Sequence, residues 1–594
     1  MRGFDWTIVL VYCAASLALG VVLARRGSRS LEDFFLSGRS LPWWLAGTSM
    51  AATTFSIDTP LYVAGVVGNR GIAGNWEWWS FAASHVLMIT LFARLWRRSE
   101  IVTDAELIEL RYGGRPAAVL RASKAFLFAV PINCIAVGYS MLAAAKVVAA
   151  LRIWEGLGYA PGQEIWGMDP KLLSVTAISL LTLVYAGFSG LWGVVATDFF
   201  QFVLAMVGAV IVAIYAISSP RIGGLPGLVE HVQSVGNLDV LSFVPLHRGG
   251  SGFLGIAWSA LAGISASTFF AYIFVQWWSF RRSDGGVEFI QRLAASKNEG
   301  EAEKAAWLFN VMHYVVRTWP WILVALAALV LYPNLADREL GYPTLMLDFL
   351  PVGILGLVVA SLLAAFMSTV STQINWGASY LAHDLYRRFW KPQATQKELV
   401  LVGRIASVGI TALGALAAFF SRDVATVFRL VIAIGTGPGV VLILRWFWWR
   451  VNAWAELSAM IAGFLAGFFT TTVPVLRIAD FGIRLMVITG ITALVWITVM
   501  FLTPPESPET LERFYRKVRP GGPGWGRERR ATGLEPLHPL KPALLRTVSA
   551  LALLYGLMFG IGALLLLKWV TAGAMLILIA MGYAGLRAGA RRTA

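Results

Sequence analysis

Charged residues are scarce in this 594-residue chain: 14% are Asp, Glu, Lys or Arg, whereas 57% are hydrophobic. About a quarter of the residues of a soluble protein are charged, and a soluble chain of this length would divide into several domains. Apolar runs of about 20 residues recur from end to end instead, and a helix of that length crosses the roughly 30 Å hydrocarbon core of a bilayer. The composition therefore predicts an all-α polytopic membrane protein of the cell membrane.

Residues for covalent chemistry are also lacking. Both cysteines, Cys13 and Cys134, lie in apolar runs, which argues against a disulfide framework or a cysteine metal site. The six histidines lack metal-binding spacing, H-E-x-x-H is absent, and there is no G-x-x-x-x-G-K-[ST] for an ATP-driven pump. The chain is predicted not to be an enzyme, which leaves a transporter, a channel or a membrane receptor.

The net charge of +16 is explained by short basic loops rather than by a nucleic-acid partner. If the N-terminus lies outside, loops such as RLWRRSE, FRRSDGG and LYRRFWK all fall inside, across about fifteen transmembrane helices, and the C-terminus is inside as well. We expect a ten-helix transport core at 42–450, preceded by a retained accessory helix and loop at 1–41 and followed by two accessory helices at 451–503. A cytoplasmic linker at 504–544, with a short helix near Thr510–Val518, then leads to a helical hairpin at 545–594.

Two apolar spans are interrupted by small and polar residues. In span 42–67, Pro60 has no backbone N–H and so cannot donate the hydrogen bond that a helix interior requires. The hydroxyls before it can bond to the carbonyls left without a donor, which predicts a helix broken near 53–60. The alternative is a kinked but continuous helix. Span 253–278 carries a second predicted interruption at 263–268. Interrupted spans five helices apart are typical of inverted-repeat transporters, whose binding sites lie between the broken helices.

The stretch SLLAAFMSTVSTQINWGASYL, residues 361–381, places four hydroxyls within five positions of an apolar span. Helical spacing gathers Ser368, Thr369, Ser371 and Thr372 into one patch. Such hydroxyls can simply bond to their own helix or tighten helix packing. Four of them near a broken helix favour a site for a hard cation, which prefers oxygen ligands. Asp198 could supply the anionic ligand, or it could cap the start of a helix.

Three stretches resemble the sodium:solute symporter family, which includes the sodium/glucose, sodium/proline and sodium/sialic acid cotransporters. They are LEDFFLSGRSLPWWLAGTSMAATTFS at 31–56, GLWGVVATDFFQ at 190–201 and AAFMSTVSTQINWGASYLAHDLYRR at 364–388. The resemblance covers roughly residues 6–503. It implies a LeuT-type fold, which consists of five helices followed by an inverted repeat of five more.

The resemblance also implies site residues. A first sodium site would use Ala52, Phe55, Ala365, Ser368 and Thr369, and a second one would use Asp198, Ser371 and Thr372, so that one or two Na⁺ ions are coupled to transport. The solute would meet Thr54, Asp58, Thr59, Thr268 and Tyr272. Arg317, inside the next span, is expected to snorkel to the cytoplasmic interface, with contact to a solute carboxylate as the alternative.

The predicted function is sodium-coupled import of a small polar solute, namely a sugar or polyol, an amino acid or an organic acid, by alternating access. One alternative is proton coupling through Asp58 or Asp198. Another is a membrane sensor that signals through 503–542, and a channel is the least favoured. The predicted partners are the solute and the lipid bilayer, with no nucleic acid and no obligatory protein partner.

Overall fold

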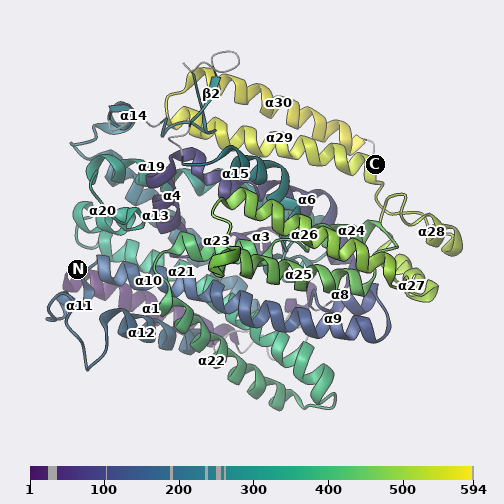
Figure 1. The fold of residues 1–594 in the computed structure, drawn as a ribbon. Helices are drawn as coiled ribbons and strands as arrows, with labels where there is room; N and C mark the ends of the chain where they lie inside the picture. The colour runs from purple at the N-terminus through teal and green to yellow at the C-terminus, as the bar shows by residue number, and fades with distance from the viewer. Residues whose placement is uncertain are drawn as a thin grey trace.

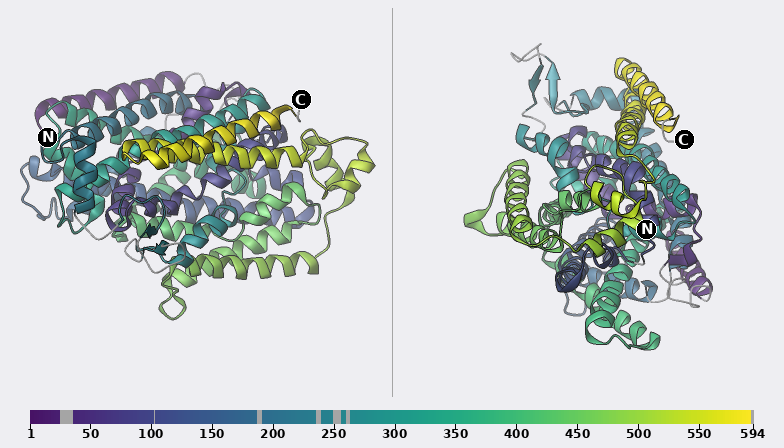
Figure 2. Two further views of the ribbon diagram at one scale, coloured as in Figure 1. Left: turned by 90° about the horizontal axis from the view of Figure 1, so that it is seen from above. Right: turned by 90° about the vertical axis from the view of Figure 1, so that its right-hand side faces the viewer.

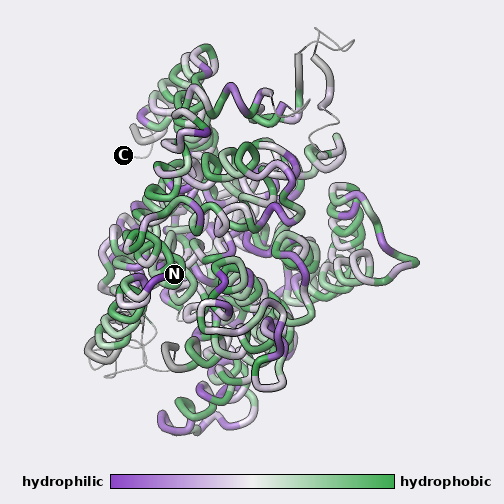
Figure 3. Tube along the Cα trace, turned by 90° about the vertical axis from the view of Figure 1, so that its left-hand side faces the viewer, coloured by the Kyte–Doolittle hydropathy of each residue, from purple (hydrophilic) through white to green (hydrophobic). Residues whose placement is uncertain are grey.

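The computed structural model describes residues 1–24, 36–101, 103–186, 191–234, 239–248, 256–259 and 263–591. Long helices lie side by side along a common direction (Figure 1), and the described strands are the antiparallel pair β1 (Leu246–Arg248) and β2 (Ile256–Trp258). Within the described ranges, nine helices are long and apolar enough to cross a membrane. Hydrophobic residues predominate along the helices (Figure 3). The predicted class, an all-α polytopic membrane protein, is confirmed.

The helices follow one another in two series that correspond to the two predicted repeats. The first contains α3 (Trp43–Thr53), α4 (Asp58–Arg70), α5 (Trp76–Trp79), α6 (Ala82–Leu87), η3 (Met88–Phe92), α7 (Ala93–Ser99), α8 (Glu106–Arg111), α9 (Gly114–Leu127), η4 (Phe128–Ile132), α10 (Asn133–Ala150), α12 (Pro170–Ala186) and α13 (Leu191–Ile217). The second contains α15 (Ala266–Ala271), η7 (Tyr272–Gln276), α16 (Trp277–Ser279), α17 (Val287–Ala295), α18 (Glu299–Asn310), η8 (Val311–Val316), α19 (Thr318–Leu331), α21 (Ile354–Ser379), η10 (Tyr380–Trp390), α22 (Gln396–Phe420), α23 (Val424–Gly435) and α24 (Gly439–Phe447).

The remaining helices lie around these two series. They are α1 (Gly3–Ala24), α25 (Ala453–Thr472), α26 (Phe481–Leu502), α27 (Pro508–Val518), α28 (Gly526–Thr532), α29 (Leu540–Leu565) and α30 (Trp569–Arg591), with the shorter α11 (Ile153–Gly156), α14 (Gly224–Ser234) and α20 (Gly341–Phe349). The helices α29 and α30 pack against each other at one edge of the molecule (Figure 2), and α1 packs against α21 and α13.

The predicted break in the first span is confirmed. Helix α3 ends at Thr53 and α4 begins at Asp58, so residues 54–57 leave the helix. Pro60 falls in the first turn of α4, where a backbone N–H has no acceptor within the helix, so the proline costs no helix hydrogen bond. The carboxylate of Asp58 lies at the same helix start, where negative charge is favourable. The alternative of a continuous kinked helix is therefore wrong.

The second break was predicted in the wrong place. The hydroxyls at 265–268 begin a helix rather than interrupt one: Ser265 is the N-cap of α15, and its side chain accepts from the Thr268 N–H. The helical run continues through α16, and the break lies at 280–286, before α17. It ends with Gly285 and Gly286, whose φ angles of 137° and 83° suit glycine alone. Span 253–278 is accordingly not one helix.

The segment that contains FRRSDGG is likewise more than a cytoplasmic loop. Helix α17 is buried along most of its length, together with Arg281, Asp284, Glu288 and Arg292. Asp284, Glu288 and Arg292 are tolerated because each lies in an ion pair, with Arg445, Arg282 and Asp198 respectively. Arg281 instead lies over the rings of Phe128 and Phe280. Helix α17 is thus the second half of a broken helix, as α4 is of the first.

The region 504–544 folds against the ends of several core helices. The short helix expected near Thr510–Val518 is α27. The guanidinium of Arg111 lies over the rings of Phe514 and Trp525, at 5.4 and 5.1 Å from their centroids. The Glu506 carboxylate accepts hydrogen bonds from the backbone N–H groups of Gly113 and Ala453, at 2.8 and 3.1 Å. This region therefore joins the segment between α8 and α9 to the start of α25.

A buried ion-pair cluster holds the second break to α24 and α25. Arg445 donates to Asp284 at 2.7 Å and to Glu456 at 2.9 Å, and all three side chains are buried. Replacing Arg445 with Met would leave two buried carboxylates without their cation, so we expect a loss of about 3–5 kcal/mol of stability and a clear fall in the melting temperature of the detergent-purified protein.

The matched control is Arg388→Met. Arg388 pairs with Glu109, but 47% of its side chain is exposed. Exposed pairs contribute about 0–1 kcal/mol, so its melting temperature should stay near that of the unaltered protein. Equal shifts in the two variants would contradict the structural role of Arg445.

Candidate solute and sodium sites

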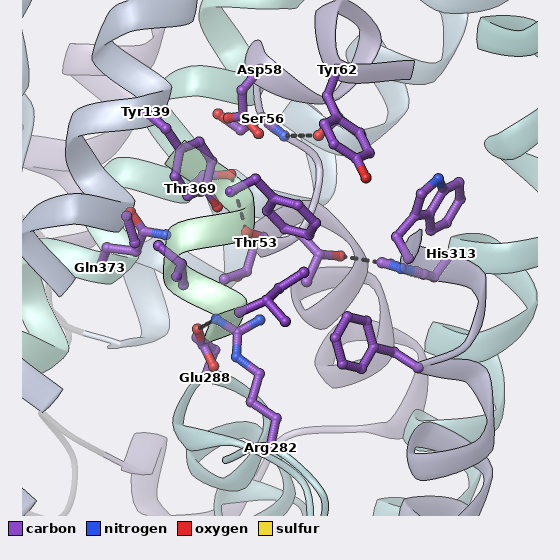
Figure 4. Close-up of a pocket in the computed structure, with 18 of the residues that line it drawn as sticks. Thr53, Ser56, Asp58, Tyr62, Tyr139, Arg282, Glu288, His313, Thr369 and Gln373 are labelled. Atoms are coloured by element: carbon purple, nitrogen blue, oxygen red, sulfur yellow. Dashed lines mark hydrogen bonds and ion pairs between the residues drawn. The ribbon is translucent and has the colours of Figure 1, made fainter. Parts of the chain in front are cut away.

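A cavity of about 140 Å³ lies beside the first break, between the two broken helices (Figure 4). A water molecule needs only about 10–15 Å³ of such space, so the cavity is large enough for a small organic solute. Its polar lining comes from the first break, from the second break and from helices opposite them. The polar lining residues are Thr53, Thr54, Ser56, Asp58, Thr59, Tyr62, His85, Tyr139, Arg282, Glu288, His313, Tyr314, Arg317, Thr369 and Gln373.

Three of the five predicted solute residues, Thr54, Asp58 and Thr59, lie in the wall of this cavity. Thr268 and Tyr272 do not. The Thr268 hydroxyl accepts from the Gly482 N–H at 3.0 Å, at the start of α26, and the Tyr272 hydroxyl donates to Glu77 at 3.3 Å. From the second broken helix, Phe280, Arg282, Glu288 and Phe289 line the cavity instead, because the break lies later than the sequence indicated.

The Asp58 carboxylate is held by neutral groups. Ser140 on α10 donates to Asp58 Oδ1 at 2.8 Å, and Ser56 donates to Ser140 Oγ at 3.4 Å. Among the ion pairs of the described residues, Asp58 has no cationic partner. The carboxylate therefore keeps hydrogen-bonding capacity for a solute group such as a hydroxyl or an amine.

Arg317 is placed differently from the expectation. Its Nη1 donates to the Ala51 carbonyl and to Thr54 Oγ1, both at 3.1 Å, and its side chain is buried. The guanidinium thus lies at the C-terminal end of α3, where a cation is favoured, and does not snorkel to an interface. His313, one helical turn before it, also contacts Thr54, at 3.1 Å. His313 was not singled out from the sequence. A histidine and an arginine four residues apart inside an apolar span are the signal that could have identified this pair.

Aromatic side chains border the polar part of the cavity. The rings of Tyr62 and Phe428 lie 4.9 Å apart, and those of Phe81 and Phe280 lie 5.1 Å apart. Tyr62 lies on α4 and Phe428 on α23, whereas Phe81 lies between α5 and α6 and Phe280 lies at the second break. All four rings line the cavity, so separation of either pair would widen it.

The hydroxyl of Thr369 on α21 faces the carbonyls freed at the first break. It donates to the Thr53 carbonyl at 3.1 Å and to the Phe55 carbonyl at 3.3 Å. The Ala52 carbonyl accepts from the Phe55 N–H at 2.9 Å, and Ala365 is buried one turn before Thr369. Carbonyl and hydroxyl oxygens are the ligands that a hard cation prefers, so this set of residues fits a sodium ion.

Ser368, the remaining member of the predicted first site, points its proton toward α13. Its hydroxyl donates to Asp198 Oδ1 at 2.5 Å. A hydroxyl that donates elsewhere still has lone pairs for a cation. Asp198 lies well inside α13, which begins at Leu191, so it does not cap that helix.

The residues of the predicted second site are engaged by other groups. Ser371 donates to the Ser368 carbonyl at 3.2 Å, and Thr372 Oγ1 accepts from Arg292 Nη2 at 3.1 Å. Asp198 Oδ2 accepts from Ser49 at 2.6 Å and lies 3.7 Å from Arg292 Nη2. Arg292, which the sequence pattern did not single out, therefore lies between Asp198 and Thr372.

Comparisons with known proteins identify the family of this chain. The model of the sodium:solute symporter family matches residues 34–463. The sodium/glucose cotransporter of Vibrio parahaemolyticus is 26% identical over 500 residues, covering 79% of this chain and 85% of that protein. Sodium/myo-inositol cotransporter 2 of Oryctolagus cuniculus is 23% identical over 557 residues, covering 85% and 78% of the two chains. The solved structure of a Na⁺-coupled sialic acid symporter, substrate-bound and outward-open, has a TM-score of 0.65 and 19% identity, covering 85% of this chain and 99% of that chain.

Two broken helices around a central cavity, inside an all-helical membrane protein, define a transporter of the LeuT-type fold, as the sequence predicted. The chain belongs to the sodium:solute symporter family. Family and fold support a multi-pass membrane protein that carries out Na⁺-coupled symport of a small-molecule solute, and they point to a transporter rather than an enzyme.

Proposed function

We propose that this protein imports a small polar organic solute with sodium bound at Ala52, Phe55, Ala365, Ser368 and Thr369. The observation that carries the proposal is the contact of the Thr369 hydroxyl with the carbonyls of Thr53 and Phe55. The first broken helix supplies the Ala52 and Phe55 carbonyls, and α21 supplies the Ala365 carbonyl and the hydroxyls of Ser368 and Thr369. The transport core is assigned to 42–450, with the other segments as accessory parts.

Sodium binding at this site would be coupled to solute transport because the ion connects the first break to α21. The Thr369 hydroxyl of α21 donates to the carbonyls of Thr53 and Phe55 at this break. A sodium ion bound by the Phe55 carbonyl of the break and by the Thr369 oxygen of α21 would hold α3 and α4 in one position relative to α21. Coupling requires that sodium binds one conformation of the carrier more tightly than the other, and we assign that preference to the outward-open one.

The solute is proposed to bind in the cavity beside the break, against Thr54, Asp58 and Thr59. Asp58 would accept from solute hydroxyl or amino groups, while Arg317 and Arg282 offer donors to solute oxygens. A sugar or polyol, an amino acid and an organic acid all have groups that these side chains can bind. The named sugar and inositol relatives favour a polyhydroxylated solute.

Replacement of sodium tests the proposed coupling ion. In proteoliposomes at fixed pH, we expect uptake driven by an inward sodium gradient to fall to background when choline replaces sodium, because the trimethylammonium group of choline cannot approach oxygen ligands as closely as a bare Na⁺ ion does. Undiminished uptake in choline, together with uptake driven by a pH gradient, would instead establish proton coupling through Asp58 or Asp198.

A further inference from the structure

Asp198 is surrounded by side chains from three other helices. Ser49 belongs to α3, Arg292 to α17 and Ser368 to α21, while Asp198 itself belongs to α13. Asp198 Oδ1 accepts from Ser368, and Oδ2 accepts from Ser49. The side chains of Asp198 and Arg292 are each only 1% exposed. A carboxylate this deeply buried needs a cation close by to remain charged.

The guanidinium of Arg292 is held by hydrogen bonds at all three nitrogens. Its Nε donates to Ser49 Oγ at 3.2 Å. Its Nη1 donates to the Glu288 carbonyl at 3.2 Å and to the Gln291 side chain at 3.1 Å. Its Nη2 donates to Thr372 Oγ1 at 3.1 Å and to Thr53 Oγ1 at 3.4 Å. The position of the positive charge is therefore fixed by this set of contacts.

The same contacts conflict with a sodium ion bound by Asp198, Ser371 and Thr372. Ligand oxygens lie about 2.3–2.6 Å from a hard cation of this size. An ion that close to both Asp198 Oδ2 and Thr372 Oγ1 would lie within about 6 Å of Arg292 Nη2, which is 3.7 Å from the first oxygen and 3.1 Å from the second. Arg292 already donates to Thr372 Oγ1, and a second positive charge this close to the guanidinium inside a buried site would be repelled by it.

We propose that the guanidinium of Arg292 is a resident cation that takes the place of a second sodium, so that this carrier couples a single sodium ion to each solute. The inference rests on the proposed function, since it concerns the number of ions and not the identity of the coupling ion. Ser371 and Thr372 then serve as parts of α21 packing and of the Arg292 hydrogen bonds.

The guanidinium of Arg292 also helps to orient the Ser368 hydroxyl of the first sodium site. Arg292 Nη2 lies 3.7 Å from Asp198 Oδ2, and Asp198 Oδ1 accepts the Ser368 proton. The Ser368 oxygen then presents lone pairs to sodium rather than its proton. Asp198 is a positioning residue for Ser368 because it accepts the Ser368 proton. Arg292 acts on Ser368 only through its pairing with Asp198.

Counting bound sodium in the purified protein tests the inference. Equilibrium binding of radioactive sodium should reach one ion per chain in the unaltered protein, and the sodium dependence of its melting temperature should fit a Hill coefficient near one. In Arg292→Met the carboxylate loses its cation, so we expect binding to rise to two ions per chain and the melting temperature to become more sensitive to sodium. Two ions bound to the unaltered protein would overturn the proposal.

Two further variants keep the test decisive. Asp198→Asn combined with Arg292→Met removes both charges together, so it should fold and bind a single ion even if Arg292→Met alone is unstable.

Arg281→Met is the matched control, because Arg281 is buried in the same broken helix but lies over the rings of Phe128 and Phe280. It should also bind a single ion. An equal gain of a second ion in Arg281→Met would contradict the assignment to Arg292.

Failure of this inference is distinguishable from failure of the proposed function. Two ions per chain with sodium-driven uptake would leave the sodium symporter intact and reject only the resident cation. No bound sodium at all, with uptake unchanged in choline, would reject both.

Discussion

Thr369→Ala is expected to weaken sodium binding by about 10–150-fold, and sodium-driven uptake should fall to near background at ordinary sodium concentrations. The hydroxyl is one of five proposed ligands, and it faces the Thr53 and Phe55 carbonyls at 3.1 and 3.3 Å. A bond between a charged partner and a neutral group contributes about 1.5–3 kcal/mol, which corresponds to that range of affinity. The measurement is the sodium concentration that gives half-maximal uptake, or half-maximal thermal stabilisation.

The conservative variant separates a ligand role from a packing role. Thr369→Ser keeps the hydroxyl and removes a methyl group, so its sodium dependence should remain close to that of the unaltered protein. Ser368→Ala should weaken sodium binding in the same direction as Thr369→Ala. Unchanged sodium dependence in both alanine variants would contradict the assignment of the first site.

Asp58→Asn is expected to weaken solute binding strongly while sodium binding persists. Asp58 lines the cavity, and its nearest partners are the hydroxyls of Ser140 and Ser56. An amide cannot offer two acceptor oxygens, so a solute hydroxyl or amine loses a charge-assisted bond of about 1.5–3 kcal/mol, or about 10–150-fold in affinity. Stabilisation of the purified protein by sodium alone should be retained, since Asp58 is outside the five proposed sodium ligands.

Ser140→Ala is the control for Asp58. It removes one hydrogen bond to the carboxylate but leaves the carboxylate itself, so solute binding should weaken less than in Asp58→Asn. Solute binding that is unchanged in Asp58→Asn would show that the solute lies elsewhere in the cavity.

The first broken helix could be predicted from the sequence because local chemistry determines it. Pro60 and the hydroxyls before it identify the segment, and the break lies at 54–57. The four hydroxyls of α21 were recognisable for a similar reason, since helical spacing alone places them together. These are short-range features of the chain.

The second broken helix could not be located in the same way. Hydropathy does not distinguish the apolar residues around β2 from a membrane helix, and the charged residues of 281–292 have the composition of a loop. Their burial depends on partners far away in sequence, such as Asp198 for Arg292 and Arg445 for Asp284. The predicted contribution of Thr268 and Tyr272 to the solute site depended on the earlier position of this break.

A thermal-shift screen of the purified protein against sugars, polyols, amino acids and organic acids, each with sodium and with choline, tests the central claim most directly. The account predicts one solute class that raises the melting temperature only when sodium is present, and that this joint effect disappears in Thr369→Ala. A solute that stabilises the protein equally in sodium and in choline would contradict sodium coupling through the first broken helix and α21.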